Sequence, residues 1–188
     1  MKPELKLASD LARQIKVITE AQALKEYPWP NIDAFRRFLR GYERDGLLMK
    51  TSANARERDV EVCLATVRPG DDMPSHHTIA YRAAMLWGDL QPVVVLTATA
   101  KLRALYGGES HTLISAHLSH EIALTDIFFA KRQANPDFEW TLTNSKPGNG
   151  SLPDAIAGET AFELVGRYNG STVGAKLSIA ATHTLELW

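Results

Sequence analysis

The chain has 188 residues, of which 45% are apolar and 23% are charged, and its formal net charge is -1. This composition allows a real hydrophobic core in one large domain or two small ones. No apolar run approaches the roughly 20 residues of a membrane span, and the N-terminus lacks the long apolar segment of a signal peptide. We therefore expect a soluble, cytoplasmic protein without a membrane partner.

The charge is unevenly divided along the chain. Residues 1–70 contain 13 Lys and Arg against 10 Asp and Glu, whereas residues 71–188 contain 8 against 12. The overall charge argues against a nucleic-acid-binding protein, but the division is compatible with a small DNA-binding module attached to a non-binding body. The single cysteine, Cys63, cannot form an internal disulfide, and the alternating run around it predicts a buried strand thiol.

Local patterns predict three helices with tight connections in the first 46 residues. Apolar residues at every fourth position predict an amphipathic helix over residues 7–16. Thr19 and Gln22 have the spacing of a capping box, which predicts the start of a second helix. Asn31 can cap a third helix, which runs to Arg44.

The third helix separates apolar and basic residues onto different faces. At about 100° per residue, Phe35, Phe38 and Leu39 share a face that can join a core. The other face carries four fixed positive charges, Arg36, Arg37, Arg40 and Arg44. This arrangement is typical of a DNA-reading helix, and it also fits an ordinary surface helix whose arginines are solvated.

The segment after this helix predicts a β-hairpin. Strands are expected at Leu47–Thr51 and Val60–Val67, on either side of a polar tip at Ser52–Asp59. Three helices followed by a hairpin predict a winged helix-turn-helix domain over residues 1–68, with the third helix in the major groove and the hairpin over the phosphates. The predicted DNA-binding residues are Arg36, Arg37, Arg40, Arg44, Lys50, Arg56 and Arg58. Winged helices also serve as protein-interaction modules, and that alternative stays open.

The rest of the chain predicts connecting helices and a strand over residues 69–110 and a small α/β domain over residues 111–188, so the fold class is α+β. The expected helices are Thr78–Trp87, Ala98–Tyr106 with Thr97 as its cap, Ser115–Ala134 and Ala175–Ala181. The expected strands are Val93–Leu96, Phe138–Thr143, Ala155–Ala157, Ala161–Val165 and Thr184–Trp188.

Three acidic residues in the second half could carry chemistry. Glu121 lies on a long helix, Asp154 at the entry to a strand, and Glu163 in the next strand. Such acids can hold Mg²⁺, which activates water and neutralises a scissile phosphate. The order resembles the PD-(D/E)XK nuclease fold, but that pattern has a lysine where Val165 stands here. We therefore expect a degenerate, catalytically silent domain, unless Arg167 replaces the lysine.

Histidines offer a second candidate metal site. His117, His120 and Glu121 share a helix at spacings of three and four residues, which can gather a metal. No further cluster of Cys or His supports a metal there, so capping and hydrogen bonding are the favoured roles.

Several short motifs, in this order behind the N-terminal winged helix, resemble plasmid replication-relaxation proteins. They are Val95-Leu96-Thr97 before a helix, the helix Ser119–Asp126, Leu152-Pro153-Asp154-Ala155, and Ala161–Val165 followed by Gly166-Arg167-Tyr168. The resemblance implies a winged helix joined to a nuclease-like domain, a role in plasmid replication control or mobilisation, and double-stranded DNA as the partner.

Three hypotheses follow. The first is a DNA-binding accessory or regulatory protein of a plasmid or other mobile element, acting as a homodimer and without a cofactor. The second is a Mg²⁺-dependent nuclease that uses Asp154 and Glu163 to hold the metal, with Glu121 beside them. The third is a protein-interaction module, contacting a partner of a replication or mobilisation complex, that has no affinity for DNA.

Overall fold

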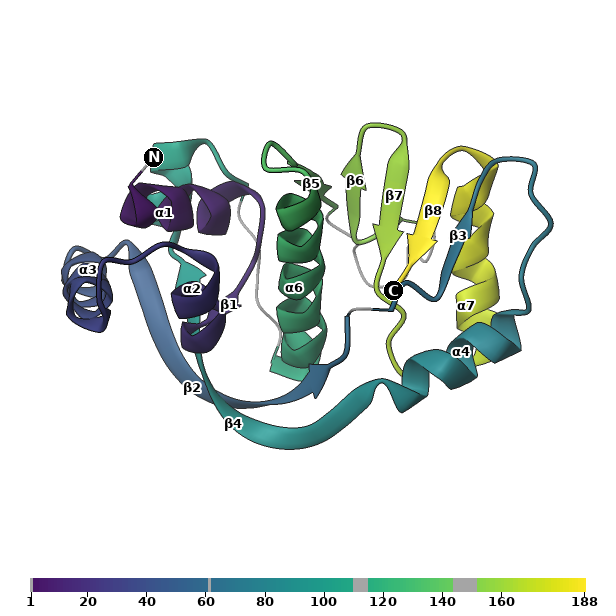
Figure 1. Ribbon diagram of the computed structural model, residues 1–188, viewed down its shortest axis with the longest axis horizontal. Coiled ribbons are helices and arrows are strands. Elements are labelled where there is room, and N and C mark those ends of the chain that lie inside the picture. The colour runs from purple at the N-terminus through teal and green to yellow at the C-terminus, as the bar shows by residue number, and fades with distance from the viewer. Residues whose placement is uncertain (1, 61, 110–114, 144–151) are drawn as a thin grey trace. The chain divides into compact units, whose positions relative to one another are not determined.

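The computed structural model describes residues 2–60, 62–109, 115–143 and 152–188, and the fold is a mixture of helices and two β-sheets (Figure 1). The chain divides into two compact units, each built from two separate segments. Unit 1 comprises Met1–Arg56 and Leu90–Phe129, and unit 2 comprises Glu57–Asp89 and Ala130–Trp188. This division differs from the consecutive segments 1–68, 69–110 and 111–188 that the sequence predicts.

Unit 1 combines helices with a three-stranded sheet in the order β1-β4-β2. Its elements are α1 (Pro3–Arg13), β1 (Ile18–Thr19), α2 (Glu20–Glu26), α3 (Ile32–Arg44), β2 (Leu48–Arg58), β4 (Trp87–Ala98), α5 (Ala100–Tyr106), the 3-10 helix η1 (Ser115–His117) and α6 (Leu118–Ala134). The last residues of β2, the first of β4 and the last of α6 belong to unit 2. β4 is the central strand, and it pairs antiparallel with β1.

Side-chain caps start two helices of unit 1, α2 and α3, where the sequence predicts them. The predicted capping box is confirmed, because Thr19 Oγ1 accepts from the Gln22 N–H while the Gln22 side chain accepts from the Thr19 N–H. Asn31 caps α3 by accepting from the Ala34 N–H at 2.8 Å. The expected cap at Thr97 is wrong, because β4 continues to Ala98 and Thr99 caps α5 instead.

The core of unit 1 joins segments that are far apart in the sequence. Val17, Ala55 and Val95 pack with Leu118 and Ile122 of α6. The last turn of α1 and the residues that follow α5 lie very close together. A Cβ atom on Gly108, which comes after α5, would lie 1.9 Å from the carbonyl oxygen of Ala12 in α1. Only glycine fits at this crossing.

The hairpin expected at Leu47–Thr51 and Val60–Val67 is wrong. The polar stretch predicted as its tip lies inside the long strand β2, whose partner is β4, about thirty residues later than the predicted strand. The later part of the predicted second strand forms β3 (Ala65–Val67), which belongs to the other sheet, while Glu61 lies outside the described residues. A strand of polar residues forms here because β4 supplies its hydrogen-bond partners.

Unit 2 contains a five-stranded sheet in the order β3-β8-β7-β6-β5. Its other elements are α4 (His76–Met85), β5 (Thr141–Leu142), β6 (Ala155–Ala157), β7 (Thr160–Glu163), α7 (Gly170–Leu177), the 3-10 helix η2 (Ser178–Ala181) and β8 (Thr184–Leu187). β5, β6 and β7 form an antiparallel meander, and β8 lies parallel to β7 after the crossover through α7. The expected loop at Asn144–Gly150, between β5 and β6, lies outside the described residues.

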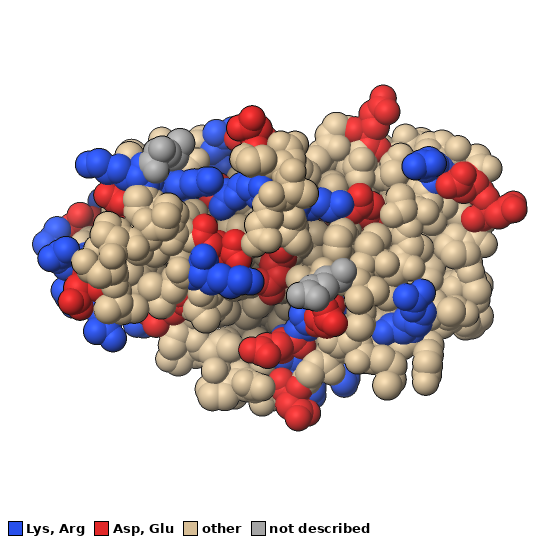
Figure 2. All heavy atoms as spheres, viewed as in Figure 1, with Lys and Arg blue, Asp and Glu red and all other residues tan. Residues whose placement is uncertain are grey.

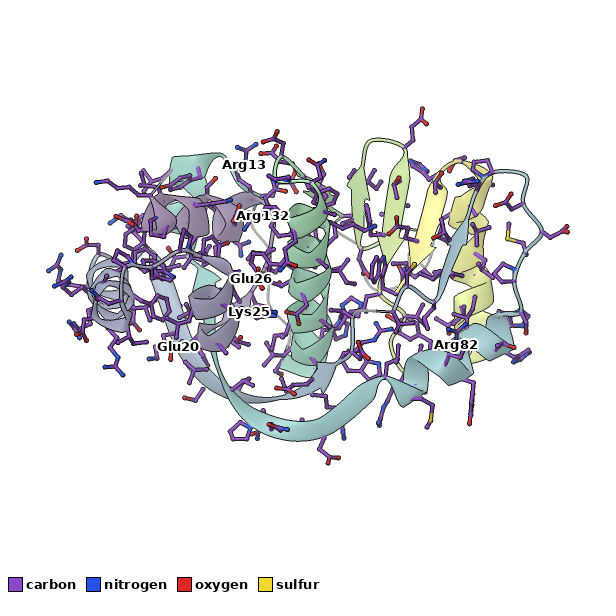
Figure 3. All side chains as sticks on the ribbon, viewed as in Figure 1. Arg13, Glu20, Lys25, Glu26, Arg82 and Arg132 are labelled. Atoms are coloured by element: carbon purple, nitrogen blue, oxygen red, sulfur yellow. The ribbon has the colours of Figure 1, made fainter. Side chains whose placement is uncertain are left out.

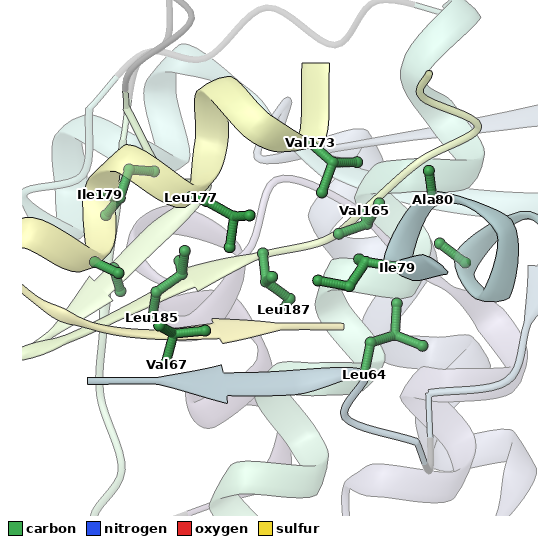
Figure 4. Packing of buried hydrophobic residues seen from close by; sticks show 13 residues of the cluster. Leu64, Val67, Ile79, Ala80, Val165, Val173, Leu177, Ile179, Leu185 and Leu187 are labelled. Atoms are coloured by element: carbon green, nitrogen blue, oxygen red, sulfur yellow. The ribbon is translucent and has the colours of Figure 1, made fainter. Parts of the chain in front are cut away.

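One face of the unit 2 sheet packs against α4 and α7, and the opposite face contacts Lys131 of α6. Leu185 and Leu187 of β8 pack with Ile79 of α4 and with Val173 and Leu177 of α7 in one buried cluster (Figure 4). On the other face, Lys131 of α6 lies over the rings of Phe162 and Trp188 and pairs with Glu186. No helix among the described residues is long and apolar enough to cross a membrane.

Candidate nucleic-acid interface and acidic site

The third helix, α3, has the two faces that its sequence predicts. Phe35, Phe38 and Leu39 are buried against unit 1. All four arginines, Arg36, Arg37, Arg40 and Arg44, are exposed. Figure 2 shows basic side chains over the end of unit 1 where Figure 1 places α3, with acidic groups among them. The helix therefore presents a basic surface that its own caps and core hold in place.

Ion pairs within the chain neutralise some of these arginines only weakly. Arg36 Nη1 lies 3.9 Å from the Asp33 carboxylate, and both side chains are solvent-exposed. Arg44 Nε donates to Asp45 at 3.0 Å, and this hydrogen bond raises the pKa of the Arg44 guanidinium above its ordinary value. Exposed pairs of this kind are easily exchanged for a phosphate contact, because solvent screens them.

Arg37 differs from the other three in its surroundings. It borders a groove of about 650 Å³ whose lining includes the aromatic side chains of Trp29, Phe38 and Tyr42. The rings of Trp29 and Phe38 lie 5.2 Å apart, and those of Phe38 and Tyr42 lie 4.3 Å apart. Arg36 and Arg40 therefore form the part of the basic face that lies away from the groove lining.

Basic residues predicted on the hairpin occupy three different environments. Lys50 pairs with Glu20 at 2.6 Å, so an acidic residue of α2 shares its charge. Figure 3 shows Glu20, Lys25 and Glu26 on this helix. The Arg56 backbone N–H donates to Ser119 Oγ in unit 1. Arg58 is only 7% exposed and ends β2 in unit 2, so it does not lie at an exposed hairpin tip as the sequence predicts, and its contact with a phosphate stays a prediction.

The acidic site of unit 2 contains two of the three predicted carboxylates. Asp154 lies beside the end of β7, because its backbone N–H donates to the Phe162 carbonyl at 2.9 Å. The Asp154 carboxylate accepts from the Leu164 N–H at 2.8 Å, and Glu163 has no solvent exposure. The third predicted residue, Glu121, lies in unit 1, where it pairs with Lys16 at 2.8 Å.

Lys176 of α7 supplies a cation to this acidic site, which the sequence analysis missed. Its ammonium group lies 3.0 Å from the Glu163 carboxylate and donates to the Leu152 carbonyl at 2.8 Å. The prediction began this helix at Ala175, whereas Asn169 caps it by accepting from the Thr172 N–H. The Asn-Gly-Ser-Thr run could have revealed that start. Val165 joins the apolar cluster and Arg167 is exposed.

The described residues contain no group of three or more His, Cys, Asp or Glu side chains that could hold a metal. The less favoured alternative of a metal site at His117, His120 and Glu121 therefore gains no support from the described residues. His117 is exposed on η1, and the Glu121 carboxylate is engaged by Lys16.

Comparison with known proteins adds no relative. No protein-family model, curated protein or solved structure matches the chain. The function must therefore be argued from the geometry of the two units.

Proposed function

We propose that unit 1 is a winged-helix unit that binds duplex DNA, with α3 as the reading helix. The observation that carries this proposal is the pair of exposed arginines Arg36 and Arg40 on a helix whose opposite face, including Phe35, is buried. Arginine fits both phosphate oxygens and the edge of guanine in the major groove.

The order of the elements supports the same proposal. A helix, a short strand, two helices and two further strands, with the last strand in the centre of the sheet, is the order found in winged helices. β1, β2 and β4 take the places of the three strands. The connection between β2 and β4 then runs through unit 2 rather than through a short hairpin, so phosphate contacts are proposed for α3 and Arg56 rather than for a wing tip.

Charge reversal on α3 tests the proposal. Arg36→Glu with Arg40→Glu is expected to abolish binding to a duplex without changing the thermal unfolding temperature, because both side chains are exposed. Wild-type affinity should fall with salt, with a slope of about 0.9 per phosphate contact in a double-logarithmic plot. The measurement is a gel-shift or anisotropy titration at two salt concentrations.

A matched control separates the α3 surface from overall charge. Arg68→Glu with Arg82→Glu changes the net charge by the same amount at two exposed positions of unit 2. This variant is expected to keep most of the affinity. Equal loss in both double variants, or unchanged binding in the α3 variant, would contradict the proposal. A copurifying protein together with no DNA affinity would favour a protein-interaction module instead.

A second candidate function is a Mg²⁺-dependent nuclease in unit 2, and the position of Lys176 favours it. The segment α6-β5-β6-β7-α7-β8 has the element order of the PD-(D/E)XK fold, with Asp154 before β6 and Glu163 at the end of β7. Lys176 brings to Glu163 the ammonium group that Val165 cannot supply. Two neighbouring carboxylates suit Mg²⁺, which completes its coordination with water, and the bound metal would activate a water molecule for phosphodiester hydrolysis.

A plasmid-nicking assay with and without Mg²⁺ tests this candidate. Activity that needs the metal and disappears in Asp154→Ala and in Lys176→Met would support it. Absence of metal-dependent cleavage by the wild-type protein means that the Glu163–Lys176 pair is structural. The ammonium group then neutralises the buried carboxylate in place of a metal ion.

The motif order that resembles plasmid replication-relaxation proteins extends the first proposal to a biological role. We propose an accessory factor in replication control or mobilisation of a plasmid or other mobile element, binding as a homodimer. Light scattering of the protein with and without a duplex measures the number of copies bound.

A further inference from the structure

Two buried donor groups lie side by side in unit 2, at the ends of β2 and β4. The Asp59 N–H donates to the Leu86 carbonyl, and the residues next to these two, Arg58 and Trp87, are in contact. The Arg58 guanidinium lies over the Trp87 indole, 5.3 Å from the ring centroid. Stacking on an aromatic face fixes the plane of the guanidinium.

None of the polar atoms in this pair has a hydrogen-bond acceptor among the residues that the structure describes. The atoms concerned are Nε, Nη1 and Nη2 of Arg58 and Nε1 of Trp87, and solvent does not reach them. Arg58 as a whole is 7% exposed. Buried donors are normally paired, and a buried charge without a partner is strongly destabilising.

Neighbouring groups compensate the buried charge of the guanidinium only in part. Burial lowers the pKa of Arg58 to about 10, while the neighbouring Asp59 and Tyr168 oppose this shift. The group therefore remains positively charged at neutral pH. A site that offers several N–H donors and a positive charge attracts an anion with several acceptor oxygens.

We propose that Arg58 and Trp87 form a binding site for a phosphate group, held by the guanidinium fork and the indole N–H. Arginine matches an oxyanion with parallel hydrogen bonds, which a spherical ion such as chloride cannot accept in the same way. The phosphate is either a free ion or a group of a phosphorylated ligand such as nucleic acid. The proposal does not depend on the function of α3, because both residues belong to unit 2.

Thermal unfolding of the full chain with inorganic phosphate tests the site, at an ionic strength kept constant with chloride. The unfolding temperature of the wild type is expected to rise with phosphate concentration and then to level off as the site fills. Arg58→Met keeps an unbranched apolar stem and removes the donors, so phosphate should not raise its unfolding temperature. Arg82→Met, which removes an exposed arginine of α4 (Figure 3), should respond as the wild type does.

Two milder variants keep the test informative if Arg58→Met does not fold. Trp87→Phe keeps the ring but removes the N–H, and Arg58→Lys keeps the charge but removes the fork. Each is expected to weaken phosphate binding by about ten-fold, as the loss of a hydrogen bond to a charged group predicts. An equal response in all variants, an equal response to chloride alone, or no response of the wild type would overturn the proposal.

A duplex oligonucleotide distinguishes the two sources of the phosphate. If DNA supplies it, inorganic phosphate should compete with the duplex, and Arg58→Met should reduce the salt slope of DNA binding by about 0.9. If the ligand is a free phosphate, DNA binding should be the same in both proteins while the phosphate-dependent rise is still lost in the variant. Both outcomes support the phosphate site, and they distinguish DNA from free phosphate as its ligand.

Discussion

Gly108 and Gly41 are two glycines whose surroundings predict opposite effects of the same substitution. Gly108→Ala would place a Cβ atom 1.9 Å from the rigid Ala12 carbonyl, whereas nothing lies within 4 Å of the corresponding position on Gly41 in α3. We expect Gly108→Ala to lower the free energy of unfolding by about 1–3 kcal/mol. Gly41→Ala should raise it by about 0.5–1 kcal/mol, because alanine is the better helix former. Urea denaturation measures the free energy of unfolding of both variants. Equal changes in the two variants would contradict the close approach of Gly108 to Ala12.

Cys63 provides a pH-dependent prediction at the same scale. Burial raises the pKa of its thiol, and the sulfur donates weakly to the Ala65 and Leu187 carbonyls. Alkylation by iodoacetamide should therefore be slower than that of N-acetylcysteine at pH 8, and the rate should reach half its maximum at a higher pH. The urea-unfolded protein serves as the control and should react like the free thiol.

The sign of the linked stability effect follows from the raised pKa of Cys63. The folded state holds the thiol proton more tightly than the unfolded state does. The resulting stability is present below the ordinary cysteine pKa and is lost as pH rises through the raised value. A Cys63→Ala variant should not lose this increment, and an identical decline in both proteins would assign it to other groups.

Among the elements, α7 and β7 are joined by the Glu163–Lys176 pair, whose side chains are only 1% and 14% exposed. Lys176→Met removes the cation beside a buried carboxylate and should cost about 3–5 kcal/mol of unfolding free energy. Glu163→Gln with Lys176→Met should cost much less than the sum of the two single variants, because neither charge remains. Urea titration of the four proteins measures the coupling, and additive losses would show that the pair contributes nothing.

The elements that could be predicted from sequence are those whose start depends on neighbouring residues. Thr19 and Asn31 each cap a helix by accepting from a backbone N–H three residues later, so the predicted starts of α2 and α3 are confirmed. β2 could not be predicted, because its polar residues resemble a loop and only β4 gives them a partner. The Glu163–Lys176 contact was missed for a similar reason, since it joins a strand to a helix across a chain crossover.

At the scale of the whole molecule, the two units predict how a truncated chain behaves. A fragment ending at Arg68 corresponds to the domain that the sequence suggests, yet it lacks β4 and the α6 residues Leu118 and Ile122 of the unit 1 core. We expect this fragment to show no cooperative thermal unfolding by circular dichroism, in contrast to the full chain. A cooperative transition in the fragment would contradict the division into units.

The basic face of α3 was visible in the sequence because helical spacing alone separates Arg36 and Arg40 from Phe35. The environment of Arg58 was not visible. Its burial depends on the pairing of β2 with a strand about thirty residues away, and no local pattern reports that pairing. Sequence reasoning therefore identified the exposed charges and misplaced the buried one.

The division of each unit between distant segments also has a consequence for folding during synthesis. The helix α3 leaves the ribosome early, but the sheet beside it lacks its central strand until residues 87–98 have followed. Unit 2 waits longer, because β8 lies between β3 and β7 and pairs Leu187 with Ala65. Contacts of such long sequence separation form slowly, so a nascent chain exposes apolar segments that a chaperone would recognise before either sheet is complete.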